Sequence, residues 1–356
     1  QRQRQQKQQM DRRHVSYNDA RTFLDRCCCR PERMRLLCST KATRQGGDQL
    51  LVTVEVSPGG PLVEVRETSM AEGWTGCRFS PSALWLALSL AATQSQHESY
   101  ETANTRPRAL EFGCGVALAG LTAQAVGFDT TLTDCLEGHL QSLSTHVPTT
   151  TALSAGDCCK PTLRVCHLDW LEEEGSKTAA GCHIDRGSPE NQGGTDTIGS
   201  KPAWPRLGKD EECSFDLVFA SDAMYEEHHA VLLPAVTARW LRPGGRWVFT
   251  FAIRDADMQL HFVEQLQLQG LISLNDGDLS WETACVRESC SVCQGLLAKG
   301  AMLMPNNDGS KGSDELIKQL QEVIKGHEGG GLLLKGQRPE RNNLIQSTCQ
   351  NRGNPR

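Results

Sequence analysis

Two short segments near the start of the chain alternate apolar and polar residues. Residues 50–56 are LLVTVEV and residues 62–67 are LVEVRE, with the turn-forming run Ser57-Pro-Gly-Gly60 between them. Alternation with a period of two is typical of a half-buried strand, and a glycine-containing turn joins two such strands into a hairpin. Residues 82–92 (SALWLALSLAA) form an apolar run behind Pro81, which suits the first turn of a helix. The pattern therefore predicts a β-hairpin followed by a buried helix.

From residue 108 onward, short apolar runs alternate with longer helix-forming segments. Buried strands that alternate with helices are typical of a parallel sheet with helices on both faces. The sequence therefore predicts an α/β fold, a Rossmann-like doubly wound sheet, with the hairpin as an N-terminal extension. The predicted strands are 108–112, 129–134, 163–168, 215–221 and 246–253, and the predicted helices are 117–126, 136–146, 226–241 and 258–269.

Three parts of the chain do not follow this alternation of strands and helices. Residues 1–48 are rich in Gln and Arg, and residues 172–212 are rich in Gly, Ser, Asp, Lys and Pro. Segments of such composition bury too little apolar surface to offset the cost of ordering them, so we expect both to be disordered. The tail 306–356 has the same character, apart from an amphipathic helix at 314–325 whose docking the pattern leaves open. The folded domain is expected to span residues 49–305.

Composition narrows the class of protein. The chain has 356 residues and a net charge of −6, which argues against electrostatic binding of nucleic acid by the whole molecule. It contains no apolar run of about 18 residues, so we expect no transmembrane helix. The 16 cysteines occur in clumps such as 27–29, which favours reduced thiols in a cytoplasmic or nuclear protein over a disulfide scaffold. Because the chain begins at Gln1, we expect a fragment, and organelle targeting is left open.

The run RALEFGCGVALAGL at residues 108–121 joins a predicted strand to a predicted helix through Gly113 and Gly115. Glycine lets the backbone approach a ligand closely, and the helix start presents free N–H groups. A dinucleotide fingerprint would need a glycine where Leu118 stands. Asp134 ends the next strand, where a carboxylate can accept hydrogen bonds from ribose hydroxyls. It could equally cap the following helix, and the two roles are compatible.

Acidic residues also end the third and fourth strands, whose carboxyl ends converge on one crevice. Asp169 could accept a hydrogen bond from an adenine amino group, with Trp170 as a flat apolar wall. The alternative is a surface aspartate beside a core tryptophan. Asp222 would lie at the centre of the crevice and could hold a sulfonium or an incoming amine, with the π face of Tyr225 beside it. The alternative is a helix cap and a packed aromatic residue.

Four potential metal ligands follow directly, Glu-Glu-His-His at residues 226–229. The pattern places them consecutively on a helix, so their side chains are expected to point in different directions. The pair Cys290 and Cys293 has half of a zinc-site spacing, without a second close pair. We therefore expect a solvated helix face, ordinary thiols and no metal site.

In their order along the chain, the strand-end motifs resemble a known family. These motifs are the glycine turn, Thr-Asp134, Leu-Asp169-Trp170, Asp222-x-x-Tyr225 and Pro-Gly-Gly245. They are similar to those of the seven-β-strand S-adenosylmethionine-dependent methyltransferases, in the protein-lysine methyltransferase branch (methyltransferase family 16 type). The resemblance covers about residues 75–270 and implies a seven-stranded sheet with S-adenosylmethionine as the cofactor.

The resemblance also implies roles for individual residues. Glu111, Gly113 and Gly115 would line the methionine and ribose end of the cofactor, Asp134 would bind the ribose, Asp169 and Trp170 would bind the adenine, and Asp222 and Tyr225 would be the catalytic pair facing the methyl group and the target side chain. Arg254 matches an arginine common in the branch, whose role is left open.

The implied activity is methyl transfer to a lysine side chain of a protein substrate, by a monomer without nucleic-acid or membrane partners. The chain departs from the family at Ala117, where the turn has its third glycine, and at Ser80, where the family has a tryptophan near the cofactor. These departures favour one alternative, a non-catalytic methyltransferase-like adapter. A methyltransferase acting on a small molecule or nucleic acid is another, although the N-P-P-Y type tetrad of amino-group nucleic-acid enzymes is missing from the fourth strand end.

Overall fold

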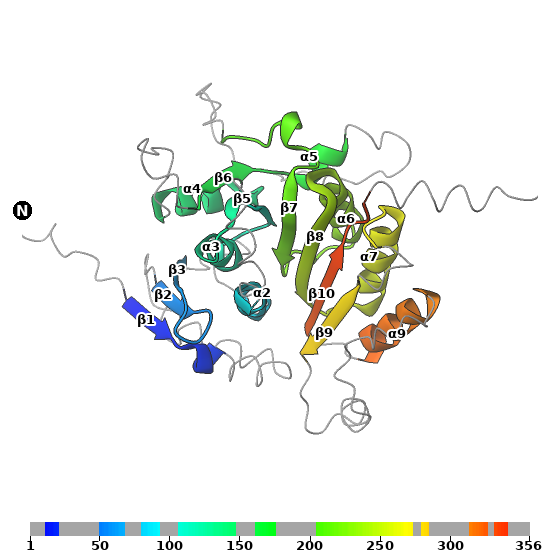
Figure 1. Cartoon of the computed structure of the whole chain (residues 1–356), viewed down its shortest axis with the longest axis horizontal. Coiled ribbons are helices and arrows are strands. Elements are labelled where there is room, and N and C mark those ends of the chain that lie inside the picture. Colours follow the sequence, from blue (N-terminus) through cyan, green and yellow to red (C-terminus); the bar gives the residue numbers. More distant parts are fainter. Residues whose placement is uncertain are drawn as a thin grey trace, which may run out of the picture.

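The computed structural model describes residues 11–20, 50–67, 80–92, 106–146, 161–175, 204–272, 279–284, 313–326 and 331–340. Within these ranges the chain forms a three-stranded sheet near its N-terminus and a seven-stranded sheet that carries the rest of the fold (Figure 1). Among the described helices, none is long and apolar enough to cross a bilayer.

The large sheet has the strand order β6-β5-β4-β7-β8-β10-β9. Neighbouring strands from β6 to β8 pair in parallel, whereas β10 runs antiparallel to both β8 and β9. The strands are β4 (Arg108–Phe112), β5 (Asp129–Asp134), β6 (Leu163–His167), β7 (Phe215–Ser221), β8 (Leu241–Ala252), β9 (Ser280–Ala284) and β10 (Gly331–Gln337). This sheet confirms the predicted α/β class. From β4 the sheet extends in one direction through β5 and β6 and in the other through β7 and β8, as in a doubly wound fold.

Helices cover both faces of this sheet. Successive residues of a strand point to opposite faces, so each strand contributes apolar side chains to the cores on both sides. Leu110 and Val218 pack into a core shared with α6 and α7, while Ala109 and Phe219 pack into a core shared with α2 and α3. Figure 1 shows α2, α3 and α4 on one side of the sheet and α6, α7 and α9 on the other. The helices are α2 (Pro81–Ala92), α3 (Leu118–Ala125), α4 (Glu137–His146), α5 (Trp170–Gly175), α6 (His229–Trp240), α7 (Ala256–Leu268) and α9 (Ser313–Gly326).

The predicted hairpin is confirmed, as β2 (Leu50–Glu55) and β3 (Leu62–Glu67) pair antiparallel with Glu55 opposite Leu62. Their buried valines, such as Val54 and Val65, join the core that α2 and α3 also line. The small sheet therefore packs on the α2 and α3 side of the molecule and extends its hydrophobic core.

The N-terminal segment contains a strand that the sequence did not predict. β1 (Asp11–Val15) pairs in parallel with β2, so residues 11–15 are ordered although residues 1–48 were expected to be disordered. Val15 is 2% exposed and belongs to the core of the small sheet. The remaining residues of that prediction, except 16–20, lie outside the described ranges.

The predicted disordered insertion is ordered at both of its ends. Helix α5 extends to Gly175, and residues 204–212 contain the short 3₁₀ helix Lys209–Glu211. The carboxylate of Glu211 accepts hydrogen bonds from Arg164 at 2.6 Å and from Arg108 at 2.5 Å. Two arginines from β4 and β6 thus hold this segment in place, and residues 176–203 lie outside the described ranges.

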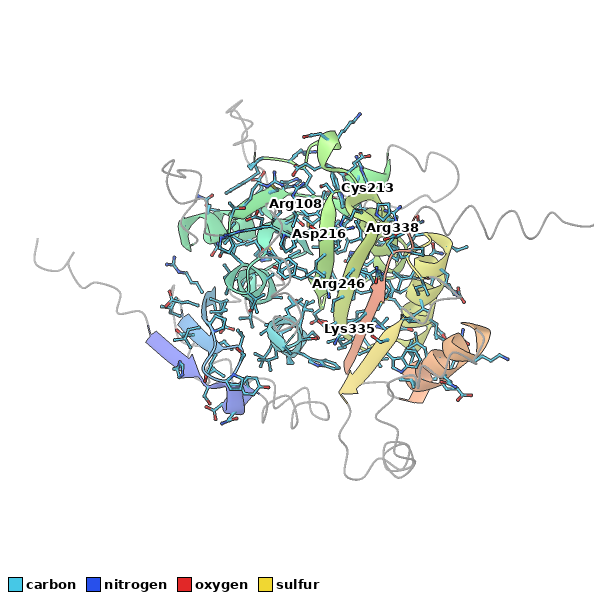
Figure 2. All side chains as sticks on the ribbon, viewed as in Figure 1. Arg108, Cys213, Asp216, Arg246, Lys335 and Arg338 are labelled. Carbon is cyan, nitrogen blue, oxygen red and sulfur yellow. The ribbon has the colours of Figure 1, made fainter. Side chains whose placement is uncertain are left out.

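The folded domain also extends beyond its predicted end at residue 305. β10 lies between β8 and β9 in the sheet, with Leu332 opposite Phe251 and Thr283. Arg338, directly after β10, donates to the carbonyl oxygens of Ala238 and Leu241, close to the end of α6 (Figure 2). Residues 331–340 of the tail are therefore part of the domain, which corrects the prediction that helix 314–325 is its only ordered element.

The predicted tail helix exists as α9 and docks on the domain. Leu320, Val323 and Ile324 are buried in the core that α6 and α7 share. Its apolar residues lie three and four positions apart, the spacing of one helix face. The structure thus shows that this helix docks on the domain, which the sequence pattern left open.

Candidate cofactor and acceptor pocket

A pocket of about 500 Å³ lies at the carboxyl ends of β4, β5 and β7, beside the residues that follow β6. This is the edge at which open α/β sheets bind their ligands. Seven of the eight residues predicted for the site line it: Gly113, Gly115, Asp134, Asp169, Trp170, Asp222 and Tyr225. The structure thus brings residues from four strand ends together, as the sequence predicted.

The glycine turn has three residues in the left-handed conformation. Gly113, Gly115 and Ala117 have φ angles of 58°, 51° and 60°. For an alanine this conformation costs roughly 1–2 kcal/mol, which explains why a glycine would be favoured at position 117. The methyl group of Ala117 is fully buried and packs with Leu132 and Leu143. The turn therefore keeps its shape without the third glycine, at the expense of local backbone strain.

Asp134 connects the turn to the next helix. Its Oδ2 accepts hydrogen bonds from the N–H of Gly115 at 3.0 Å, and its Oδ1 accepts one from the N–H of Leu136 at 2.9 Å. His139 Nδ1 lies 3.1 Å from Oδ2. The bond to Leu136 confirms the helix-capping role. A carboxylate offers about four acceptor positions, so these three partners leave about one at Asp134, which lines the pocket.

Glu111 differs from its predicted place, because it does not line the pocket. Its carboxyl group is buried behind the turn, at 1% exposure, against α3. A Cβ added at Gly120 would lie 2.3 Å from Glu111 Oε2, so this glycine leaves room for the carboxyl group. Burial raises the pKa of Glu111 well above its usual value, with Asp134 contributing and a hydrogen bond from the Gly120 N–H opposing. The Glu111 carboxyl group thus packs against α3 instead of facing the pocket.

Asp169 and Trp170 form one wall of the pocket. Asp169 Oδ1 accepts a hydrogen bond from the N–H of Leu171 at 2.9 Å, which caps α5. The Trp170 ring meets Phe112 edge-on at a centroid distance of 6.1 Å and meets His229 at 5.4 Å. Both residues therefore have structural partners and still face the pocket.

Asp222 occupies the centre of the strand edge, with an ion-pair partner. Its φ angle of 50° turns the chain sharply after β7, and its N–H donates to the carbonyl oxygen of Thr250 at 2.7 Å. Arg254 Nη2 lies 2.9 Å from the Asp222 carboxylate. Tyr225 stands at the pocket entrance with 49% of its surface exposed. The arginine whose role the sequence left open thus pairs with the predicted catalytic aspartate.

His229 is a pocket residue that sequence reasoning missed. The predicted helix 226–241 begins at His229 instead, so residues 226–228 form a turn and the expected helical face does not exist. His229 is 8% exposed, and its ring lies edge to face with the Tyr225 ring at a centroid distance of 4.5 Å. Burial, together with neighbouring His228, lowers the pKa of His229 to about 4. The imidazole is therefore neutral at pH 7, in contrast to the predicted solvated face.

Ser80 lines the pocket at the position where a tryptophan was expected from the resemblance. Its Oγ accepts a hydrogen bond from the N–H of Ala83 at 3.1 Å, so it serves as the cap of α2. The side chains of Ser80 and Ala83 are too short to reach across the pocket as an indole ring would. Among the residues that the structure describes, the segment before and at the start of α2 contributes only the small side chains of Ser80 and Ala83 to the pocket.

No protein-family model and no curated protein matches the sequence. Solved structures that resemble the fold include phosphoethanolamine N-methyltransferase 2 from Haemonchus contortus in complex with S-adenosyl-L-methionine. That match has 14% identity and a TM-score of 0.34, over 70% of this chain and 53% of that chain. An S-adenosylmethionine-dependent methyltransferase from Mesorhizobium loti matches at 14% identity and a TM-score of 0.32, over 71% and 98%.

Proposed function

We propose that this protein is an S-adenosylmethionine-dependent methyltransferase that methylates a lysine side chain of a protein substrate. The observation that carries the proposal is the joining of two half-sites in one pocket. The glycine turn with Asp134 forms one half, and Asp222 with Tyr225 forms the other. A donor bound at the first half would face an acceptor at the second.

The residues of the first half fit an adenosine-containing cofactor. Gly113 and Gly115 place no side chain between the backbone and the pocket, and Asp134 keeps an acceptor position for a ribose hydroxyl. Asp169 and the flat ring of Trp170 suit an adenine. The volume of about 500 Å³ lies within the range of roughly 300–1,000 Å³ found for small-molecule sites. When bound, S-adenosylmethionine supplies a methyl group on a positively charged sulfur that is already a good leaving group.

The second half suits a cationic or amine acceptor. The Asp222 carboxylate and the π face of Tyr225 both attract an alkylammonium group, and Tyr225 stands at the entrance. Arg254 is 46% exposed, so its side chain can leave Asp222 for solvent when an amine arrives. The amine, with a usual pKa of about 10.4, loses its proton to solvent before transfer. Asp222 and Tyr225 then orient it, which makes positioning the main contribution of the protein.

The experiment is incubation of the protein with radiolabelled S-adenosylmethionine and cell extract. We expect label in protein that is recovered as methyllysine after hydrolysis. Asp222→Ala should abolish it, because the amine loses its orienting carboxylate, whereas the exposed Glu227→Gln should retain it. Label confined to small molecules or nucleic acid would replace the lysine assignment with another acceptor. Full turnover by Asp222→Ala would remove this residue from the mechanism.

A non-catalytic adapter is the second candidate. The ion pair with Arg254 already neutralises the carboxylate that would orient an amine, and Ala117 strains the turn. An adapter that has lost its cofactor site should transfer no label to any fraction and should bind no S-adenosylmethionine. Binding measured separately from transfer therefore distinguishes the two candidates.

A further inference from the structure

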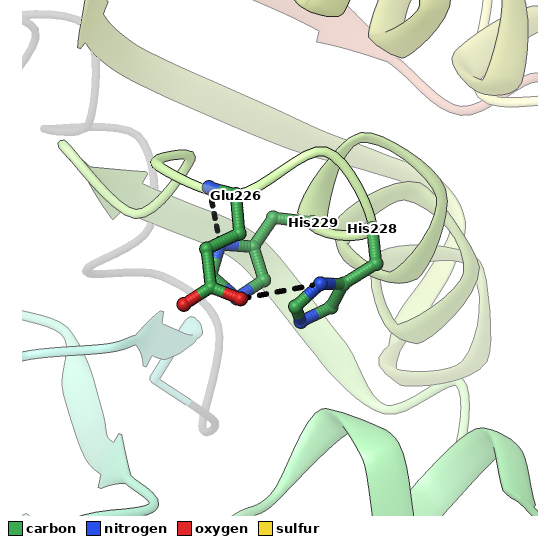
Figure 3. A group of neighbouring side chains, drawn as sticks. All are labelled: Glu226, His228 and His229. Atoms are coloured by element: carbon green, nitrogen blue, oxygen red, sulfur yellow. Dashed lines mark hydrogen bonds and ion pairs between the residues drawn. The ribbon is translucent and has the colours of Figure 1, made fainter. Parts of the chain in front are cut away.

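Three metal-ligating side chains converge at the mouth of the pocket. One ligand atom from each of Glu226, His228 and His229 lies within 4.8 Å of the others (Figure 3). Glu226 Oε2 is 3.4 Å from His228 Nδ1, and the two imidazole rings are 4.4 Å apart at their centroids. The convergence is what the helical interpretation of the sequence had excluded.

The backbone explains why these neighbours in sequence can meet. Residues 226–228 form a turn before α6, so the Glu226 carboxylate can point toward His228 and lie close to His229 (Figure 3). His229 is held by its edge-to-face contacts with Trp170 and Tyr225. The backbone N–H groups of Tyr225 and Glu226 lie 3.5 and 3.4 Å from His229 Nδ1, at the long limit of hydrogen bonding. A metal ion can replace these two weak contacts at the lone pair of His229 Nδ1.

The donor set selects the kind of ion. Two imidazole nitrogens and one carboxylate oxygen are typical of zinc and of other divalent first-row transition metals, whereas Mg²⁺ and Ca²⁺ prefer oxygen ligands. Bonds of about 2.0–2.2 Å to one ion require the donors to approach more closely than they do here. The Glu226 side chain is 59% exposed, so a change of rotamer can bring its carboxylate oxygen to the ion.

We propose that Glu226, His228 and His229 bind one divalent transition-metal ion at the mouth of the pocket. The start of α6 carries a partial positive charge that opposes a cation by roughly 0.3–1 kcal/mol, which is small beside coordination by three ligands. Three protein ligands leave at least one coordination position open. Both histidines line the pocket, so that position would be accessible to water or to a donor atom of a small ligand. The proposal is independent of methyl transfer.

The test is a titration of the full-length protein with Co²⁺, followed by visible absorption. Cobalt bound to nitrogen and oxygen gives ligand-field bands, and cobalt bound to the numerous cysteines adds an intense near-ultraviolet charge-transfer band. We expect one ion per chain with ligand-field bands and without the thiolate band. His228→Ala and Glu226→Gln should each weaken this binding at least tenfold, by analogy with the roughly 10–100-fold effect of supporting residues at metal sites. Excess Mg²⁺ should not displace the cobalt.

Glu227→Gln is the matched control, because Glu227 is the adjacent exposed carboxylate outside the cluster, and it should bind as the wild type does. Thermal midpoints in the absence of metal establish that the variants are folded. If His228→Ala does not fold, Glu226→Gln alone decides. The proposal is overturned if no cobalt binds, if only thiolate-type cobalt is found, or if the folded variants match the wild type.

Discussion

Replacing Glu211 by glutamine removes a carboxylate that joins three parts of the chain. Glu211 accepts hydrogen bonds from Arg108 of β4, from Arg164 of β6 and from the N–H of Gly208 in its own segment. Its side chain is 14% exposed, whereas those of the two arginines are 36% and 39% exposed. We expect Glu211→Gln to destabilise the protein at neutral pH, because both arginines lose their charged partner.

The size of the effect follows from the pKa of the carboxyl group. Burial alone would raise the pKa of Glu211, but the bonds from Arg164, Gly208 and Arg108 outweigh it and lower the pKa from 4.5 to about 2. That difference corresponds to at most ~3.4 kcal/mol. The half-exposed arginines are screened by solvent, so we expect about 1–2 kcal/mol at pH 7. Because the folded pKa is depressed, this stability is present above pH 4.5 and is lost as the pH falls toward 2.

Urea denaturation at pH 7 and pH 3 measures the difference between wild type and Glu211→Gln. We expect the difference to shrink at the lower pH, because the wild-type carboxyl group then begins to lose its advantage. Glu212→Gln is the control, since Glu212 pairs with Arg239 in an exposed position and should cost about 0.5 kcal/mol or less. A difference equal at both pH values, or no difference at pH 7, would refute the role assigned to this carboxylate.

Three further predictions concern the pocket residue His229 and two residues outside the pocket, Glu111 and Gly120. The folded pKa of His229 is lowered to about 4, so lowering the pH from about 6.5 toward 4 should destabilise the protein by up to ~1.4 kcal/mol per pH unit. His229→Gln should flatten that part of the stability curve measured by thermal midpoints. The pKa of Glu111 is raised in the folded state, so the free energy of unfolding of the wild type falls as the pH rises above the pKa of this group in the unfolded chain. Between pH 5 and pH 8 the free energy of unfolding of Glu111→Gln, measured by urea denaturation, should therefore rise relative to that of the wild type. Gly120→Ala places a Cβ 2.1 Å from Leu132 Cδ2, and overpacking of ~1–3 kcal/mol should exceed its gain of about 1 kcal/mol in helix propensity. An unchanged urea midpoint for Gly120→Ala would contradict that packing.

The parallel strands and the glycine turn could be predicted because their signals are local. Each strand is an apolar run bounded by turn residues, and the acids at 134, 169 and 222 follow directly from the strand ends. The order of parallel strands brings such ends to one edge whatever the details of packing. For this reason seven of the eight predicted site residues line the pocket.

The remaining features depend on partners far away in the chain. β10 is a short leucine-rich run whose role is defined by pairing with β8 and β9, and Glu211 is ordered by arginines of two distant strands. The burial of His229 depends on where α6 begins, which the apolar periodicity of residues 226–241 does not mark. Local propensity carries no information about such contacts, since they arise only when the sheet has formed.

Calorimetric titration with S-adenosylmethionine tests the central claim, that the pocket is a cofactor site. We expect one molecule per chain with a Kd between about 1 µM and 1 mM, the range in which the KM values of enzymes commonly lie. Asp134→Asn should weaken binding at least tenfold, because an oxygen that faces Leu136 leaves an NH2 group in place of the Oδ2 that accepts from Gly115, and the proposed ribose acceptor loses its charge. Thermal midpoints without ligand verify that the variant is folded. No binding by the wild type, or equal binding by folded Asp134→Asn, would contradict the account.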